Sequence, residues 1–133
     1  MAQDHLRFEP LNHRIGKGVY QVPLLVDENR NPFHPYTEPL LRAAEIIAPR
    51  LGKEAGQLAV GSLVEKVGTL LEISDKTEES TDKIEGLIIE GDEGEGAIQI
   101  KPDTSLISRR DGDEYLVPSA AFLEMLRSWQ RQK

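Results

Sequence analysis

The chain has 133 residues, a formal net charge of −7 and no cysteine, and 38% of its residues are hydrophobic. A chain of this length buries about 65 to 70% of its unfolded surface around one core, so we expect a single domain over residues 1–133. The missing cysteine excludes disulfides, thiolate metal ligands and cysteine nucleophiles, and is typical of a reducing compartment. Without a signal-peptide pattern or an apolar run of about 18 residues, the sequence predicts a cytoplasmic protein that does not bind membranes.

Negative charge is concentrated in one part of the sequence. Residues 72–95 contain ten carboxylates and two lysines, a net charge of −8, so the remaining residues are close to neutral. Nonspecific binding to nucleic acid needs clustered lysine and arginine. Because the basic residues are scattered along the chain, we do not expect direct contact with nucleic acid.

The N-terminal region is expected to contribute little regular structure. Residues 1–18 show little periodicity and predict an irregular arm with at most one short strand, and Gly16-Lys17-Gly18 predicts a plain turn because no phosphate-loop motif is completed. Residues 19–26 are β-branched and apolar, which is typical of a strand, and Pro23 favours a sheet edge because proline cannot donate to the ladder. Residues 27–36 are rich in turn formers and predict a surface connection.

Two helices are predicted next. Thr37 can cap the first one, over about residues 38–48, which ends at a proline. Apolar residues at three- and four-residue spacing predict a second, amphipathic helix over about residues 54–73. Gly61 and Gly68 share a face of this helix, where either a neighbouring backbone approaches closely or the glycines only weaken the helix.

The second half of the chain is expected to be rich in β-structure. Residues 74–83 contain no apolar residue and predict a charged internal linker. Strands are expected after it at residues 84–90, 97–101, 104–109 and 114–117. Asp111–Gly112 predicts a hairpin turn in which both positions need positive φ. Ser119 is then expected to cap a last helix over residues 119–130.

Together these elements predict an α+β fold in which a short antiparallel sheet of three to five strands packs against two or three helices. The predicted order of elements is β-α-α-β-β-β-(β)-α. The side chains expected in the core are Leu40, Ile47, Leu63, Val64, Val67, Leu70, Leu71, Ile88, Ile98, Ile100, Leu106, Leu116, Phe122, Leu126 and Trp129.

One segment matches part of a calcium-loop pattern. Asp27, Asn29 and Asn31 occupy the first, third and fifth positions, and Glu38 occupies the twelfth. Pro32 stands at the sixth position, where the sharp turn requires glycine. We therefore predict a polar connection between a strand and a helix, and assign no metal and no cofactor.

Histidine is the residue type best suited to acid-base catalysis at neutral pH, and the chain has three histidines, all before the first predicted helix. Neither H-E-x-x-H nor G-x-S-x-G occurs. His13 and His34 could meet Asp27 to hold a metal or to position a water molecule. A small metal-dependent hydrolase is therefore an alternative hypothesis, against surface histidines in a proline-rich loop.

The acidic segment carries the main functional hypothesis. Complementary charge steers the encounter of two proteins and selects the partner. We therefore favour a non-enzymatic protein-binding domain, such as an inhibitor, immunity factor or assembly component of bacterial or phage origin, whose partner carries a basic surface. The candidate partner-binding residues are Glu78, Glu79, Asp82, Glu90, Asp92, Glu93 and Glu95. A solvated linker would carry the same charge, and a structural subunit of a larger assembly is a further alternative.

Overall fold

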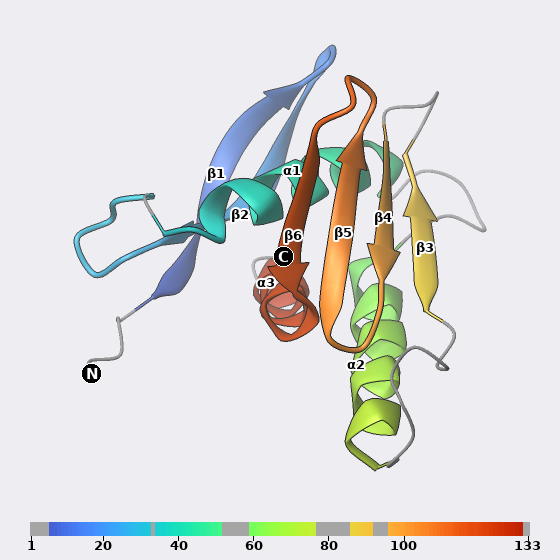
Figure 1. The fold of residues 1–133 in the computed structure, drawn as a ribbon. Helices are drawn as coiled ribbons and strands as arrows, with labels where there is room; N and C mark the ends of the chain where they lie inside the picture. Colours follow the sequence, from blue (N-terminus) through green and yellow to red (C-terminus); the bar gives the residue numbers. More distant parts are fainter. Residues whose placement is uncertain (1–5, 33, 52–58, 77–85, 92–95, 132–133) are drawn as a thin grey trace.

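The computed structural model describes residues 6–32, 34–51, 59–76, 86–91 and 96–131, and Figure 1 shows its fold. The described residues form two antiparallel sheets and three α-helices, so the predicted α+β class and the rough order of elements are confirmed. The elements are β1 (Arg7–Ile15), β2 (Gly18–Val26), α1 (Thr37–Ile47), a 3₁₀ turn (Ala48–Arg50), α2 (Val60–Lys76), β3 (Leu87–Glu90), β4 (Gly96–Ile100), β5 (Thr104–Arg109), β6 (Glu114–Pro118) and α3 (Ser119–Arg131).

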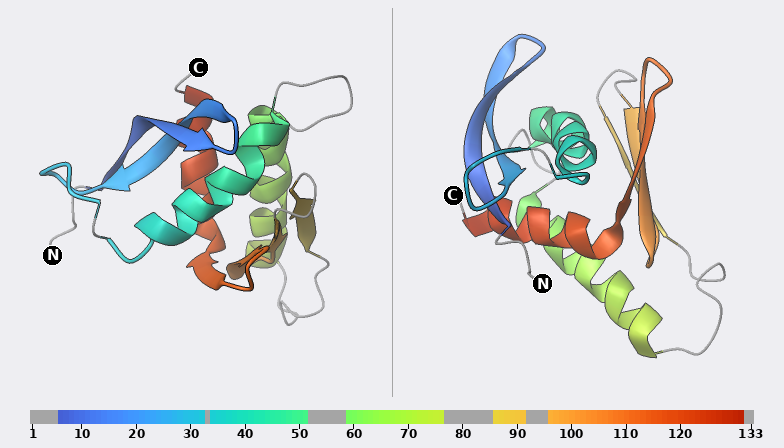
Figure 2. Two further views of the ribbon diagram at one scale, coloured as in Figure 1. Left: turned by 90° about the horizontal axis from the view of Figure 1, so that it is seen from above. Right: turned by 60° about the vertical axis from the view of Figure 1, so that its left-hand side comes forward.

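Helix α1 lies between the two sheets, as the right-hand view of Figure 2 shows. The hairpin of β1 and β2 covers one side of α1, and the sheet with the order β3-β4-β5-β6 covers the other. Helix α3 contacts β5 and β6 and packs against α2. No described element covers the opposite face of the four-stranded sheet, which we call its outer face.

The N-terminal region forms a long hairpin, so the expectation of an irregular arm was wrong. Strand β1 has nine residues and pairs with β2 from end to end. None of these nine residues is fully buried. Apolar and polar residues therefore alternate only weakly in this segment, and the strand is formed by its pairing with β2. The plain turn at residues 16–17 is confirmed, and Gly16 has a φ of 61°, as the first position of a type II′ turn requires.

Both edges of the hairpin carry a proline. Pro10 lies directly opposite Pro23. Counted outward from the two-residue turn, this pair falls at a position without mutual hydrogen bonds, so both proline nitrogens face the free edges. The ladder loses no hydrogen bond, and each edge lacks one donor that a further strand would need.

Helix α1 begins at Thr37, but Thr37 does not cap it as expected. Its hydroxyl donates to the Leu25 carbonyl at 3.0 Å, and no side chain caps the N-terminus of the helix. The buried Thr37 hydroxyl therefore ties the first turn of α1 to β2. The α-helix ends at Ile47, and Pro49 lies in the following 3₁₀ turn, close to the predicted end.

Helix α2 continues to Lys76, three residues beyond the predicted end at residue 73. The charged segment 74–83 therefore begins inside the helix, and its remainder lies outside the described residues, as does the predicted start at residues 54–58. None of the helices in the described ranges has the length and apolar composition needed to cross a membrane.

The two glycines of α2 have different surroundings. A Cβ atom at Gly61 would lie 3.1 Å from Nε2 of Gln130 on α3, whereas nothing lies within 4 Å of a Cβ atom at Gly68. The described residues therefore show no neighbouring backbone close to either glycine, and the approach to Gly61 is made by a side chain of α3.

The four strands β3 to β6 form the expected antiparallel meander. The hairpin turn at Asp111–Gly112 is present, but only Gly112 has a positive φ, of 97°. The Gly112 N–H donates to the Arg109 carbonyl at 3.0 Å, and the Arg109 N–H donates to the Asp113 carbonyl at 2.8 Å. This is the pattern of a type I turn followed by a left-handed glycine, so the expectation of two positive φ angles was wrong.

Helix α3 is joined to the sheet by buried hydroxyl groups. The Ser119 hydroxyl donates to the Lys101 carbonyl and accepts a hydrogen bond from the Ser105 hydroxyl at 2.8 Å. Both serines are fully buried. The hydroxyl that was expected to cap the helix therefore holds its first residue against the turn between β4 and β5.

Most predicted core residues are buried, and the errors follow one rule. Those confirmed as buried are Leu40, Ile47, Leu63, Val67, Leu70, Ile98, Ile100, Phe122, Leu126 and Trp129, and Val64, Leu71 and Leu106 are partly buried. The expectation that Ile88 and Leu116 lie in the core was wrong. Their side chains are 65% and 64% exposed, whereas their neighbours Ile89 and Val117 are buried. Where two apolar residues follow one another in a strand, alternation fits either face.

Candidate functional site

The three residues of the hydrolase hypothesis have separate partners. His13 Nε2, on β1, lies 2.8 Å from Glu45 Oε2 on α1. His34 Nδ1 accepts a hydrogen bond from the Tyr36 N–H at 3.1 Å, and Asp27 bonds to its own loop. Among the residues that the structure describes, no three histidine or carboxylate side chains gather to hold a metal. The structure therefore does not bring His13, His34 and Asp27 together as a metal site.

Asp27 organises the connection that follows β2. Its Oδ1 accepts hydrogen bonds from the backbone N–H groups of Asn29 at 2.8 Å and Asn31 at 2.9 Å. The Asp27 N–H in turn donates to the Asn31 carbonyl at 3.0 Å, and Arg30 adopts a positive φ of 67°. A carboxylate bonded in this way acts as a turn former.

One of the seven predicted partner-binding carboxylates, Glu90, lies within the described residues. It stands at the end of β3 with an exposed side chain. Its backbone carbonyl accepts a hydrogen bond from the Arg50 guanidinium, which ties the 3₁₀ turn to β3. The others, Glu78, Glu79, Asp82, Asp92, Glu93 and Glu95, lie outside the described residues. The wider acidic surface therefore stays a prediction.

The outer face of the four-stranded sheet presents an apolar row that sequence reasoning missed. We call outer-face row the side chains of Ile88, Gln99, Leu106 and Leu116, which lie opposite one another on β3 to β6. Ile88 and Leu116 are about two-thirds exposed, and Leu106 between them is partly buried. Sequence reasoning placed all three apolar residues in the core, and the strand register would have been needed to find this surface.

A second row on the same face ends in a carboxylate on each side. Glu90, Ala97, Ser108 and Glu114 lie opposite one another, and both glutamates are exposed. Side chains two residues apart in a strand share a face, so this row runs beside the outer-face row. The outer face therefore combines exposed apolar side chains with acidic groups at both edges, a composition suited to contact with another protein.

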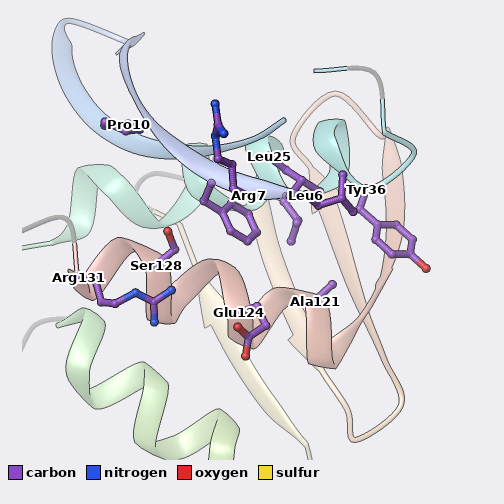
Figure 3. Close-up of a pocket in the computed structure, with 11 residues that line it drawn as sticks. Leu6, Arg7, Pro10, Leu25, Tyr36, Ala121, Glu124, Ser128 and Arg131 are labelled. Carbon is purple, nitrogen blue, oxygen red and sulfur yellow. The ribbon is translucent and has the colours of Figure 1, made fainter. Parts of the chain in front are cut away.

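A groove of about 670 Å³ lies between the hairpin and α3 (Figure 3). Its lining is mostly apolar and includes Leu6, Phe8 of β1 and Leu25 of β2. Arg7 of β1 and Arg131 of α3 add charged groups. The volume falls within the range of about 300 to 1,000 Å³ that small-molecule sites have.

Ser128 is the polar group most enclosed by this groove. It is 7% exposed, and its hydroxyl makes no hydrogen bond with the described residues. A nucleophilic serine needs a hydrogen-bonded general base. Glu124, which also lines the groove, instead accepts a hydrogen bond from Arg127 at 2.9 Å. The groove is therefore better suited to binding than to acyl transfer.

An exposed charge network lies at the open end of the hairpin. Glu9 Oε2 accepts hydrogen bonds from Arg30 Nε at 3.0 Å and from Arg7 Nε at 2.9 Å. The hydrogen bonds from Arg30 and Arg7 lower the pKa of Glu9. Negative charge is therefore favoured on this carboxyl in the folded chain.

A second charge network joins α1 to the hairpin. Burial disfavours the charged form of Arg42, but the hydrogen bonds and charge of Glu45 and the hydrogen bond of Glu38 outweigh it, so the pKa of Arg42 is raised. Arg42 Nη1 lies 2.8 Å from Glu45 Oε2, the atom that also contacts His13. Glu45 is therefore held from two sides, by its own helix and by β1.

Comparison with protein families, curated proteins and solved structures gives no match to this chain. Function therefore has to be inferred from the chain's own surfaces. Three features are candidates for binding: the outer face of the sheet, the groove beside α3 and the charge network around Arg42.

Proposed function

We propose that this chain is a non-enzymatic protein-binding domain that docks a partner protein on the outer face of the four-stranded sheet. The exposure of Ile88 and Leu116 on this face is the observation that carries the proposal. Fully burying such a side chain contributes about 1.5 to 3 kcal/mol. Single exposed apolar residues are common, but these two share one row with Leu106, and Gln99 is the one polar member of that row.

Charge at the edges of the outer face supports a partner with a basic surface. Glu90 and Glu114 flank the face, and the sequence around β3 belongs to the segment of net charge −8 over residues 72–95. Lysine or arginine around an apolar centre on the partner would be attracted during the encounter and paired in the complex. A second copy of this chain fits less well, because two-fold pairing of the face would bring like charges together.

Affinity capture with matched variants tests this proposal. The wild-type chain, the double variant Ile88→Ser/Leu116→Ser and the control Val19→Ser are immobilised, and proteins retained from a lysate of the native host are quantified. Val19 is a matched control because it is 62% exposed and lies on the hairpin. We expect one basic protein that the wild type and Val19→Ser retain equally, and that the double variant binds about tenfold or more weakly.

Charge and assembly supply two further readouts. Glu90→Gln/Glu114→Gln should weaken retention less than the apolar variant, and added salt should weaken retention by the wild type because exposed charges are screened. Equal retention by the wild type and Ile88→Ser/Leu116→Ser would contradict the proposal. A dimer of the free chain that Ile88→Ser/Leu116→Ser abolishes would instead identify a second copy as the occupant, as for a structural subunit.

A further inference from the structure

A small polar pocket lies between the tip of the hairpin, α1 and the end of β5. It has a volume of about 240 Å³ and is lined by Arg14 of β1, Arg42 and Glu45 of α1, and Arg109 of β5. Figure 1 shows the hairpin turn and the turn after β5 at the same end of the molecule. Three arginines from three separate elements therefore line one pocket, in a chain whose net charge is −7.

Arg42 is bonded within the fold, whereas the other two guanidinium groups are not. Arg42 donates to Glu45 at 2.8 Å and to Glu38 at 3.3 Å. The side chains of Arg14 and Arg109 make no hydrogen bond or ion pair with any described residue. Two arginines without a partner in the described ranges, from two separate elements that line one polar pocket, form an arrangement that an anion would complete.

Gly96 allows α1 to come this close to the sheet. Gly96 lies opposite Arg109, and a Cβ atom at this position would overlap the Ser108 carbonyl oxygen and lie 3.2 Å from Ile46 Cδ1. The Ile46 side chain therefore occupies space that a larger residue 96 would need. This contact places the turn of α1 that carries Arg42 next to Arg109.

We infer that this pocket binds a phosphate group, either as inorganic phosphate or as the monoester of a small molecule. The planar fork of a guanidinium group matches the oxygens of phosphate and donates short, charge-assisted hydrogen bonds. The volume of about 240 Å³ is below the range of about 300 to 1,000 Å³ that drug-sized ligands require. The pocket is therefore smaller than a typical drug-sized site but has room for a phosphate group.

Glu45 also lines the pocket, but its negative charge is offset by Arg42 and therefore repels a bound anion less. Its Oε2 lies 2.8 Å from Arg42 Nη1 and 2.8 Å from His13 Nε2. Arg14 and Arg109 thus remain as the groups that attract the ligand. In this arrangement His13 is a positioning residue that holds Glu45 and, through it, Arg42.

Calorimetric titration of the full chain with inorganic phosphate, at constant ionic strength maintained with chloride, tests the inference. We expect saturable binding of one phosphate per chain with a Kd of about 1 mM or lower. Arg14→Gln and Arg109→Gln should each raise the Kd about tenfold or more, because each removes a charge-assisted hydrogen bond. Circular dichroism verifies that the variants remain folded.

Arg110→Gln is the matched control, because it removes the same charge one residue further along without altering the lining of the pocket. Its Kd should stay within about twofold of the wild type. A titration with glucose 1-phosphate identifies the source of the phosphate, since tighter binding favours a monoester and weaker binding favours the free ion. The inference is overturned by the absence of saturable binding up to about 10 mM phosphate, or by equal losses in Arg109→Gln and Arg110→Gln.

Discussion

The two sheets of this chain are protected in opposite ways. The hairpin of β1 and β2 has two free edges, and Pro10 and Pro23 remove a donor from each of them. The four-stranded sheet packs one face on α1 and α3 and leaves Ile88 and Leu116 exposed on the other. For the proposed function, the difference favours recognition of a partner by the side chains of a sheet face over strand addition to the hairpin.

The largest difference in the free energy of unfolding is expected between substitutions on the two faces of the four-stranded sheet. Ile107, on the inner face, is fully buried, whereas Leu116 is 64% exposed. Ile107→Ala should lower the free energy of unfolding by about 3 kcal/mol, because it leaves a cavity in the core. Leu116→Ala should lower it by less than about 0.5 kcal/mol. Denaturant unfolding measures both, and similar losses would mean that the outer face is not exposed.

The two sheets can be compared at one glycine each, Gly16 and Gly96, both of which have a positive φ. A Cβ atom at Gly96 would overlap the Ser108 carbonyl oxygen, whereas a Cβ atom at Gly16 meets nothing within 4 Å. Gly96→Ala should therefore lower the free energy of unfolding by about 2 kcal/mol or more, and Gly16→Ala by about 1 kcal/mol from backbone strain alone. Thermal unfolding ranks the two variants. The reverse order would contradict the close approach of the β5 backbone to Gly96.

Replacing both prolines should change association more than stability. Pro10→Thr/Pro23→Thr restores an N–H at each free edge of the hairpin and should alter the free energy of unfolding by about 1 kcal/mol at most. Self-association that depends on protein concentration should appear in sedimentation experiments, because the edges can then pair. Val19→Thr, which restores no N–H, is the control. A double variant that stays monomeric would show that the prolines do not protect the hairpin.

The smallest effect concerns the exposed network at Glu9. The hydrogen bonds from Arg30 and Arg7 lower the pKa of Glu9 in the folded chain. Its contribution to stability is therefore fully present above the unfolded-state pKa, and is lost as the pH falls through the lower folded-state pKa. Glu9→Gln should slightly reduce stability at neutral pH and remove this part of the acid dependence. An NMR titration midpoint for Glu9 equal to that of an unfolded peptide would contradict the network.

Local patterns in the sequence predicted most helices and strands, but they predicted the buried face only where apolar and polar residues alternate. Gln99 separates Ile98 and Ile100, so both isoleucines were correctly expected in the core. At Ile88 and Ile89 the pattern fits either face, and pairing with β4 decides which one is buried. The hairpin strand β1 was missed for a related reason, since it has no fully buried residue.

The candidate sites depend on tertiary contacts that local patterns do not contain. Arg14, Arg42 and Arg109 belong to no motif, and they line one pocket because β1, α1 and β5 come together at one end of the fold. The outer-face row depends on the register of four strands. The acidic segment was visible as a charge excess in the sequence, but a charge excess does not identify the apolar side chains beside Glu90.

Helix α1 has a consequence for how the chain unfolds. Ala43 and Ala44 have no exposed surface, because the helix contacts β2 as well as β4, β5 and β6. The hairpin cannot detach without exposing the helix that also supports the larger sheet. Both sheets should therefore be lost in one cooperative transition. Backbone amides of β2 and β5 are then expected to exchange with deuterated solvent through the same global opening, at comparable rates.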